Sequence, residues 1–363
     1  MRAGGLTCTL WQDSDQPDSE NMPRPLVTII SPTCNQERYV AACAECALAQ
    51  SYSSWEQIFV DDGSSDRTLD VLAAYRDPRI RVIPLPHAGL GELARSYNTA
   101  LAASTGSLVA ILEGDDLWPS DKLEIQTTAF EAPEVFLSWG RAELIDEAGA
   151  PAGELAMMHT RAARVRLSAR EAFHRLTRAN FLTPTVTVMI RRQVLEDIGG
   201  FQQTGSSLLV DLPTWLWATA SQSGELEFIN HRLGCYRVHG AQTSQQRRSE
   251  RTREHAQVVR RVVAGLDEHA LARVGWNESA RRRAESRAHL AEGETALEAR
   301  DYDLARPAFR AALKERAAFG DAVLALAGLL SSVVRINLVR AALTARAWVH
   351  RLRQGRAPEA SES

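Results

Sequence analysis

Four short apolar runs separated by helix-like segments dominate the first third of the chain, and this alternation constrains the fold more than any other feature. The fourth run, Leu108 to Leu112, carries no polar alternation, which is typical of a strand buried on both faces. Strands that alternate with helices predict βαβ units and a parallel sheet. The expected strands are Pro25 to Ser31, Glu56 to Val60, Ile80 to Leu85 and Leu108 to Leu112, and the expected helices are Glu37 to Gln50, Arg67 to Tyr75 and Glu92 to Ala103.

The fourth run ends abruptly in an acidic stretch formed by Glu113, Gly114, Asp115 and Asp116. Carboxylates this close together repel one another in a low-dielectric site unless a cation lies among them. Gly114 allows a tight turn that lets the carboxylates converge. The stretch therefore indicates a divalent metal that holds a diphosphate. The alternative is an acidic turn in which Asp116 or Ser120 caps the next helix.

The second run also ends in two acids, Asp61 and Asp62, which Gly63 follows. The carboxyl ends of the strands in an open α/β sheet are where a ligand is expected. We therefore expect Asp61, Asp62 and the acidic stretch after the fourth run to face one crevice at one edge of the sheet.

The chain has 363 residues, a formal net charge of −3 and five cysteines. This length allows two domains, or one large α/β domain with an appendage. The charge argues against a dedicated nucleic-acid binder. The odd, scattered cysteines fit a reducing compartment, so we expect a cytoplasmic protein. Cys43 and Cys46 have CxxC spacing, but packing on a helix face is favoured because a zinc site needs two more ligands and only Cys34 lies near.

The two ends of the chain carry no clear membrane-spanning or export signal. Residues 1–24 contain acids and prolines but no apolar core of a signal peptide, and we expect a flexible tail there. Ala317 to Val334 is apolar and about as long as the shortest membrane spans, but Asp321 interrupts it. A helix packed on protein or lying on a membrane surface is therefore favoured over a span.

The order of these motifs resembles family 2 glycosyltransferases, which have the GT-A fold. The resemblance covers residues 25–244 and implies a Rossmann-like, mostly parallel sheet with helices on both faces. The motifs that carry it are PTCN after the first strand, DDGSSD after the second, Asn98 in the third helix, EGDD after the fourth strand, and then Trp118-Pro119 and Lys122-Leu123.

The resemblance implies roles for residues at the ends of the first two strands. Asp62 matches the residue that accepts a hydrogen bond from the nucleotide base, and Asp61 supports it. Pro32 and Thr33 match the loop beside the base. Glu37 lies where family members place an acid near the nucleotide.

The acidic stretch matches the part of the family's site that binds the diphosphate and sugar. Asp115 and Asp116 match the pair that contacts the ribose and the metal, which implies Mn²⁺ or Mg²⁺. Glu113 stands in place of the first Asp of the usual DxDD and is counted with the donor-binding residues. Arg95 lies three residues before Asn98, whereas many members carry Arg immediately before that Asn. Arg95 is thus either a donor-binding residue or, as favoured, an exposed helical Arg.

Asp211 matches the residue that acts as general base in the family. An inverting transfer needs one carboxylate to take the proton of the acceptor hydroxyl. The alternative is a helix N-cap, with Pro213 at an early helical position, and both roles can hold at once. Val210 replaces a Glu that members usually carry, which leaves the acceptor open.

Arg237 and His239 match a Tyr-Arg-x-His pattern that closes over the diphosphate, so His239 is expected to contact the metal or a phosphate. A structural or surface histidine is the alternative. The processive polymer synthases of the family carry a QxxRW-like run, and none follows here. The resemblance therefore implies the transfer of single sugars.

From residue 247 the pattern changes to Ala- and Arg-rich helices, expected at 251–268, 279–299, 304–316 and 321–353. Residues 288–313 resemble one tetratricopeptide-like hairpin, which is too few for a solenoid. This helical region is expected to form a cap, a protein contact or a peripheral membrane contact. The predicted organisation is a tail over 1–24, a GT-A domain over 25–246 and a helical region over 247–363.

The resemblance implies an inverting, metal-dependent glycosyltransferase that uses a nucleotide-diphospho-sugar, with a UDP-sugar favoured. The acceptor would be a glycan, a lipid-linked sugar or another hydroxyl compound in cell-surface polysaccharide assembly, at the inner face of the membrane. A nucleotidyltransferase is the first alternative, but PTCNQE lacks the Gly-rich phosphate loop that such an enzyme needs. A non-catalytic nucleotide-sugar-binding module is the second. It is suggested by Glu113, Val210 and Cys34, the last of which replaces a base-stacking Tyr.

Overall fold

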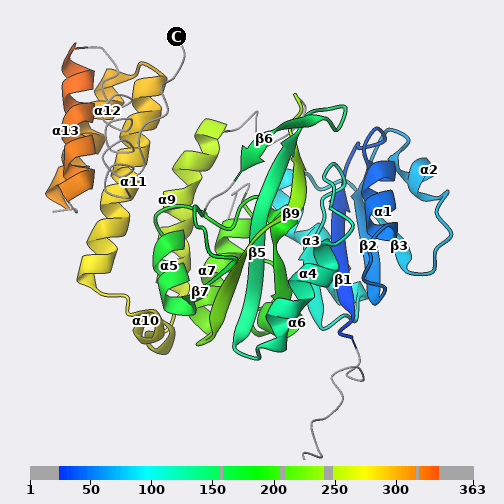
Figure 1. The fold of residues 1–363 in the computed structure, drawn as a ribbon. Coiled ribbons are helices and arrows are strands. Elements are labelled where there is room, and N and C mark those ends of the chain that lie inside the picture. The colour runs from blue at the N-terminus through cyan, green and yellow to red at the C-terminus, as the bar shows by residue number, and fades with distance from the viewer. Residues whose placement is uncertain (1–23, 156–157, 205–208, 241–247, 316–318, 335–363) are drawn as a thin grey trace, which may run out of the picture.

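The computed structural model describes residues 24–155, 158–204, 209–240, 248–315 and 319–334. Figure 1 shows a twisted sheet with helices packed against it and a further group of helices at one end. The N-terminal stretch for which we expect a flexible tail lies outside the described residues, apart from Arg24.

The four apolar runs form four parallel strands. They lie in the order β3-β2-β1-β4, so the carboxyl ends of β2 and β4 flank the end of β1. The strands are β1 (Val27–Thr33), β2 (Trp55–Asp62), β3 (Ile80–Leu85) and β4 (Leu108–Ile111), and the connecting helices are α1 (Val40–Leu48), α2 (Thr68–Leu72) and α3 (Leu93–Ala103).

β1 is displaced relative to the expected strand, because it continues through Pro32 and Thr33. The carbonyl of Pro32 accepts a hydrogen bond of 3.2 Å from the N–H of Gly114, which lies beyond the end of β4. Both backbone groups of a strand residue face the same neighbour, so the N–H that Pro32 lacks would point to a region where β4 has already ended. A proline can therefore stay in the strand without costing a ladder hydrogen bond.

The second half of the domain extends the sheet with strands of mixed direction. β8 joins β4 in antiparallel fashion, β5 pairs with both β8 and β9, and β5 and β9 run parallel to each other. β8 is only three residues long, because Thr185–Thr187 shortly before it form a single 3₁₀ turn. The strands are β5 (Val135–Ile145), β6 (Pro151–Leu155), β7 (Arg164–Ser168), β8 (Met189–Arg191) and β9 (Glu225–Arg237).

The two faces of the sheet carry two hydrophobic cores. Val27 and Ile29 of β1 pack in the core that contains Val40 of α1, whereas Ile30 packs with Tyr97 of α3 and Trp215. Side chains that alternate along a buried strand require helices on both faces. This arrangement confirms the predicted α/β class. The remaining helices of the domain are α4 (Lys122–Thr127), α5 (Ala169–Leu176), α6 (Arg192–Asp197) and α7 (Asp211–Ser221).

A helical region follows the sheet, as predicted. Its last three helices share a separate core around Phe309, and Gly293 and Gly328 allow neighbouring backbones to approach that ring. None of the described helices is long and apolar enough to cross a membrane. The helices are α9 (Arg248–Gly265), α10 (Glu268–Val274), α11 (Glu278–Glu298), α12 (Tyr302–Lys314) and α13 (Phe319–Val334), and the predicted continuation to 353 lies outside the described residues.

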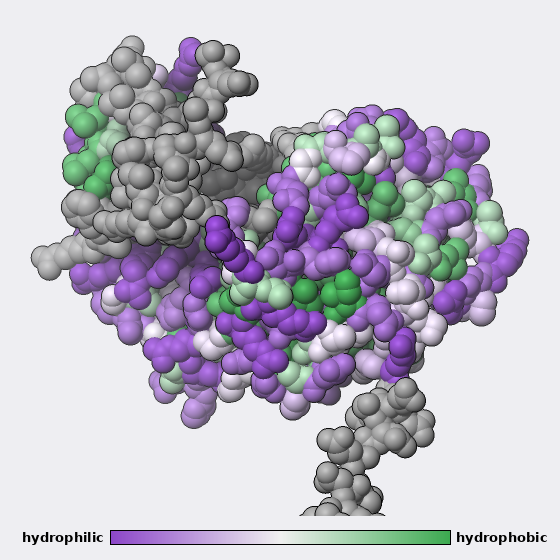
Figure 2. Space-filling view, viewed as in Figure 1, coloured by the Kyte–Doolittle hydropathy of each residue, from purple (hydrophilic) through white to green (hydrophobic). Residues whose placement is uncertain are grey.

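The outer side of this helical group exposes apolar side chains. Figure 2 shows them at the left of the view, and on α13 they are Val323, Leu326 and Leu330, which are 42%, 53% and 58% exposed. Their spacing places them along one side of the helix. The predicted protein or membrane contact of this region stays a prediction.

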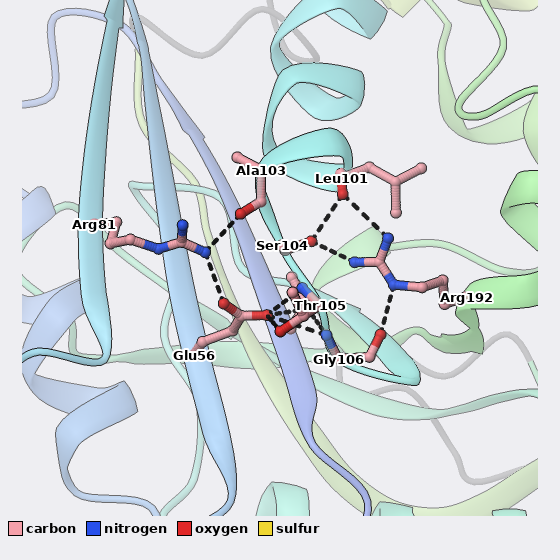
Figure 3. Close-up of polar contacts among 9 residues, drawn as sticks. Glu56, Arg81, Leu101, Ala103, Ser104, Thr105, Gly106 and Arg192 are labelled. Atoms are coloured by element: carbon pink, nitrogen blue, oxygen red, sulfur yellow. Dashed lines mark hydrogen bonds and ion pairs between the residues drawn. The ribbon is translucent and has the colours of Figure 1, made fainter.

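Three charged side chains hold the amino-terminal ends of the parallel strands (Figure 3). The carboxylate of Glu56 on β2 accepts hydrogen bonds from the N–H of Thr105 at 2.6 Å and of Gly106 at 3.1 Å, and from Arg81 at 2.7 Å. Arg192 donates to the carbonyls of Leu101 and Gly106 and to the hydroxyl of Ser104. These bonds tie β2, β3, the turn before β4 and α6 together, on the side of the sheet opposite the acidic ends.

Candidate active site

The acidic stretch after β4 packs directly on the end of β1. A Cβ at Gly114 would lie 2.3 Å from Oε1 of Gln36 and 3.0 Å from Oγ1 of Thr33. A larger residue there would have to displace the Gln36 side chain, whose oxygen accepts a hydrogen bond of 2.7 Å from the hydroxyl of Thr33. Pro32, Thr33 and the acidic stretch, which the sequence predicts to lie together, are therefore neighbours.

Asp61 and Asp62 have different surroundings at the end of β2. Asp61 is fully buried, and its carboxylate accepts hydrogen bonds from the N–H and the hydroxyl of Ser64, so it holds the following turn. The carboxylate of Asp62 accepts bonds from the N–H groups of Ala88 at 3.0 Å and Gly89 at 3.1 Å. Asp61 thus holds the turn after β2, and two backbone N–H groups fix the orientation of the Asp62 carboxylate.

Glu113 lies among other acids in a poorly solvated environment. Burial and the nearby Asp115 carboxylate raise the pKa of Glu113 to about 7, although the hydroxyl of Tyr97 donates to it at 2.5 Å and lowers that pKa. Burial, then Asp115 and Glu113, also raise the pKa of Asp116. This mutual repulsion is the condition that a bound cation would relieve.

His239 and Arg237 bring the end of β9 to the acidic stretch. Nε2 of His239 lies 3.0 Å from Oδ2 of Asp115, and the His239 ring packs on that of Tyr39 with 5.0 Å between ring centroids. The Arg237 guanidinium donates to the carbonyl of Asp115 at 2.7 Å, and its backbone N–H donates to Oδ1 of Asp116 at 2.8 Å. Arg237 therefore supports the shape of the acidic stretch, whereas Asp115 and His239 present a carboxylate and an imidazole side by side.

Asp211 is the first residue of α7. The N-cap of this helix is Val210, and no side-chain cap hydrogen bond forms there, so the capping alternative for Asp211 is wrong. Its carboxylate instead accepts a bond of 2.6 Å from the side-chain amide of Asn180. Asp211 is also close enough to Glu113 to contribute to the raised pKa of that carboxyl.

Two predicted donor-binding residues have other contacts. Glu37 accepts hydrogen bonds from the N–H and the guanidinium of Arg67 at the start of α2. Arg95 is exposed and donates to the carbonyl of Pro86 at 3.3 Å. Asn98, near Arg95, holds the backbone of Phe201 through both atoms of its amide. The donor-binding roles of Glu37 and Arg95 stay predictions.

Three site residues were missed by sequence reasoning: Tyr97, Asn180 and His87. Tyr97 precedes Asn98, so the motif pointed to its vicinity. Asn180 lies in a loop whose sequence contains no motif that points to a site. His87 follows β3, and its Nδ1 lies 3.1 Å from Oδ2 of Asp62.

A cavity of about 900 Å³ lies between the end of α5, α9 and α11. Asn180, which donates to the Asp211 carboxylate, and Leu212, the next residue in the chain, line this cavity, whereas Asp211 itself is not among its lining residues. Apolar side chains such as Val259 and Val263 form much of its wall. Its charged lining residues are Arg178, Arg260, Arg281, Glu285, Arg287 and Glu294.

Comparison with known proteins places this geometry in context. The model of "Glycosyl transferase family 2" matches residues 28–199. TuaG of Bacillus subtilis, a glycosyltransferase named for teichuronic acid biosynthesis, is 34% identical over 195 residues, which are 53% of this chain and 71% of TuaG. WfgD of Escherichia coli, a "UDP-Glc:alpha-D-GlcNAc-diphosphoundecaprenol beta-1,3-glucosyltransferase", is 35% identical over 121 residues, which are 33% of this chain and 47% of WfgD.

Solved structures share the fold at low sequence identity. TarS 1-349 of S. aureus, determined in complex with UDP-GlcNAc, has a TM-score of 0.54 and 17% identity, covering 92% of this chain and 93% of that one. The mannosyltransferase PcManGT of Pyrobaculum calidifontis, in complex with GDP-Man and Mn²⁺, has a TM-score of 0.52 and 19% identity, covering 89% and 86%. The resemblance seen in the motifs is thereby confirmed: the chain belongs to glycosyl transferase family 2, and it is a glycosyltransferase with the GT-A fold.

Proposed function

We propose that this chain transfers a single sugar from a nucleotide-diphospho-sugar to an acceptor hydroxyl, with inversion and with a divalent metal. The observation that carries the proposal is the sheet order, in which β1 alone separates the acidic ends of β2 and β4. Neighbouring strands lie about 5 Å apart, so Asp62 and the acidic stretch are within reach of one nucleotide diphosphate.

Asp62 would accept a hydrogen bond from the base. Its two carboxylate oxygens are oriented by the N–H groups of Ala88 and Gly89 and still have lone pairs free for a ligand. Structural relatives were determined with UDP-GlcNAc, with UDP and with GDP-Man. We propose a UDP-sugar as the donor.

The acidic stretch fits a hard divalent cation. Oδ2 of Asp116 is buried and has no hydrogen-bond partner among the described residues, and the Asp115 carboxylate lies beside the His239 imidazole. Carboxylate oxygens with substrate phosphates are the usual ligands of Mg²⁺, and imidazole is also compatible with Mn²⁺. Asp115 and His239 would hold the ion, with Asp116 as a further candidate. When bound, the metal neutralises charge on the departing diphosphate.

Asp211 would act as the general base. Its carboxylate takes the proton of the acceptor hydroxyl while the hydroxyl oxygen bonds to the anomeric carbon. The bond from that carbon to the diphosphate breaks on the opposite face, so the configuration inverts. Because the diphosphate leaves as an anion, no protein acid is needed on the donor side. Asn180 keeps the Asp211 carboxylate in place through its 2.6 Å hydrogen bond.

The acceptor would reach Asp211 from the cavity. Apolar walls beside charged residues suit an amphiphilic molecule, and the name of WfgD specifies a sugar on diphosphoundecaprenol. We propose a lipid-linked sugar of cell-surface polysaccharide assembly as the acceptor. Such a substrate would bring the chain to the inner face of the membrane, where the exposed apolar residues of α13 could make contact.

The test is the release of nucleoside diphosphate from a panel of UDP- and GDP-sugars in Mn²⁺, with a membrane-lipid extract as the source of acceptor. Asp211→Asn should lower release to a small residual rate while donor binding persists. Asp70→Asn, at an exposed position of α2, is the matched control and should behave as wild type. Full activity of Asp211→Asn would refute the base assignment. Donor binding without turnover in wild type, with every sugar, would favour a non-catalytic module, and pyrophosphate release from a nucleoside triphosphate would favour a nucleotidyltransferase.

A further inference from the structure

Three side chains with metal-binding atoms meet at the end of β2: Cys34, Asp62 and His87. One ligand atom from each lies within 4.8 Å of the other two. Nδ1 of His87 is 3.1 Å from Oδ2 of Asp62 and 4.0 Å from Sγ of Cys34. The backbone oxygen of Asp62 belongs to the same group, at 2.8 Å from Nδ1 and 3.5 Å from Sγ. Sulfur, nitrogen and oxygen donors thus converge from three segments of the chain.

The distances suit tetrahedral zinc. Zn–S bonds of about 2.3 Å and Zn–N and Zn–O bonds of about 2.0–2.2 Å imply a separation of about 3.6 Å between sulfur and nitrogen and about 3.4 Å between nitrogen and oxygen. The separations here are 4.0 Å and 3.1 Å. These two separations differ from the ideal values by a few tenths of an ångström, and the Cys34 sulfur and the Asp62 carboxylate oxygen lie within 4.8 Å of each other.

The surrounding backbone holds this cluster in place. The N–H groups of Ala88 and Gly89 fix the Asp62 carboxylate. Gly63 has a φ of +66°, and a Cβ there would lie 2.5 Å from the backbone nitrogen of His87. Glycine therefore permits the close approach of the His87 loop, and such fixed outer contacts are typical of metal sites.

An ion could enter from solvent. The side chain of His87 is 61% exposed and that of Asp62 16% exposed. A thiolate with an imidazole selects Zn²⁺ over Mg²⁺ or Mn²⁺, which prefer oxygen ligands. The cluster is therefore chemically different from the Asp115–His239 pair, where carboxylates predominate.

We propose that Cys34, Asp62 and His87 bind Zn²⁺, and that this ion and the nucleotide base exclude each other. The second part rests on the proposed function, in which Asp62 contacts the base. On binding, the Cys34 thiol forms an S–Zn bond and releases its proton to solvent. Burial and the carboxylates of Asp62, Asp61 and Asp66 raise the pKa of this thiol, so the free thiolate is disfavoured. The same carboxylates attract a cation. Zinc would therefore inhibit the glycosyltransferase by occupying the position where Asp62 would contact the nucleotide base.

The first experiment titrates Zn²⁺ into the metal-depleted full chain against a chromophoric chelator, without nucleotide. Wild type should bind one equivalent, and Cys34→Ser and His87→Gln should each bind at least tenfold more weakly. Cys46→Ser is the matched thiol control, and Asp115→Asn removes the other metal pair; both should bind zinc as wild type does. Substitution by Co²⁺ should give a thiolate-to-metal absorption band that Cys34→Ser lacks. Wild-type affinity in Cys34→Ser, or no zinc bound to wild type, would overturn the site.

The second experiment measures UDP binding in Mn²⁺ with and without added Zn²⁺, in wild type and in Cys34→Ser. Zinc should weaken UDP binding at least tenfold more in wild type than in Cys34→Ser. Free UDP chelates zinc to the same extent in both experiments. The difference between the zinc effects on wild type and on Cys34→Ser therefore reports only binding at the Cys34, Asp62 and His87 cluster. An equal effect on both proteins would refute the competition. If UDP fails to bind either protein even without zinc, the donor proposal is refuted, while the zinc site is judged by the first titration.

Discussion

The carboxylate of Asp211 accepts a hydrogen bond of 2.6 Å from the side-chain amide of Asn180. This bond connects the first residue of α7 with the loop after α5, and the same Asn180 lines the large cavity. An N–H bound to one carboxylate oxygen leaves the other oxygen available for a proton. The pair thus links the proposed base to the proposed acceptor site.

Asn180→Ala should lower kcat while the donor KM stays unchanged. A hydrogen bond to a charged group contributes about 1.5–3 kcal/mol, which corresponds to a loss of about 10-fold to 160-fold in rate. Steady-state kinetics would check this, with Asn230→Ala as control, because the Asn230 amide donates to the carbonyl of Thr160 instead. Since Asn180 is expected to act through Asp211, its substitution should have no further effect in Asp211→Asn. An equal loss in both backgrounds would contradict the positioning role.

Filling the cavity should affect the acceptor and not the donor. Ala291 lines the cavity on α11, so Ala291→Trp should raise the KM for the proposed lipid-linked acceptor at least tenfold while UDP binding stays as in wild type. Leu304→Trp, on an exposed part of α12, is the control. An unchanged acceptor KM would show that the acceptor binds elsewhere.

Glu56→Gln should destabilise the fold without touching the site. Burial raises the pKa of Glu56, but the bonds from Thr105, Thr28, Gly106 and Arg81 outweigh burial and lower it. A lowered carboxyl pKa stabilises the folded state above the ordinary pKa and loses this contribution as the pH falls through the folded-state pKa. We expect the free energy of unfolding at pH 7 to drop by about 2 kcal/mol, with the difference shrinking below about pH 4. Denaturant unfolding would measure this.

The control for Glu56→Gln is Glu124→Gln, whose exposed ion pair with Arg24 should contribute under about 1 kcal/mol. Equal stability of Glu56→Gln and wild type at pH 7 would contradict the account of the bonds drawn in Figure 3.

Two histidines connect the helical region to the rest of the domain, and we expect this attachment to depend on pH. Nε2 of His174 lies 2.8 Å from the carbonyl of Val274, and Nε2 of His255 lies 2.9 Å from that of Leu176. Burial lowers the pKa of both; at His174 nearby arginines add to the effect, and at His255 the Asp211 carboxylate opposes it. Stability should therefore be complete above about pH 6.5 and decline as the pH falls through the lowered values.

Differential scanning calorimetry at a series of pH values from 7 to 5 would measure the melting temperature and so test this attachment. The double variant His174→Gln, His255→Gln keeps amide donors but cannot titrate. Its melting temperature should therefore fall less between pH 7 and pH 5 than that of wild type. Each kcal/mol of difference in the free energy of unfolding corresponds to about 2–4 °C. His231→Gln, at an exposed ion pair with Asp121, is the control and should follow wild type. A double variant that loses as much as wild type would place the pH dependence elsewhere.

The sequence predicted the parallel half of the sheet well, because short apolar runs that alternate with helix-like segments indicate parallel strands. β3 has the bounds expected for it, and α3 differs by one residue. The length of β5 could not be predicted, because its continuation to Ile145 depends on pairing with β9 and β6. Local pattern does not encode such distant partners.

Some site residues could likewise be predicted from the sequence, whereas others depend on tertiary packing. Asp62 and Asp115 follow buried strands, so their common edge could be predicted from topology. The contact of His239 with Asp115 spans 124 residues and was expected only through a family pattern. Asn180 and His87 lie in loops, where the positions of side chains follow from tertiary packing that no local motif records.

The central claim is that acids from separate strands act together around one cation and one nucleotide. Calorimetric titration of UDP with and without Mn²⁺ tests it most directly. We predict binding at least tenfold tighter with Mn²⁺, with this gain lost in Asp115→Asn and His239→Gln, and retained in Asp211→Asn. Equal binding of UDP with and without the metal, or a full metal gain in Asp115→Asn, would contradict the claim.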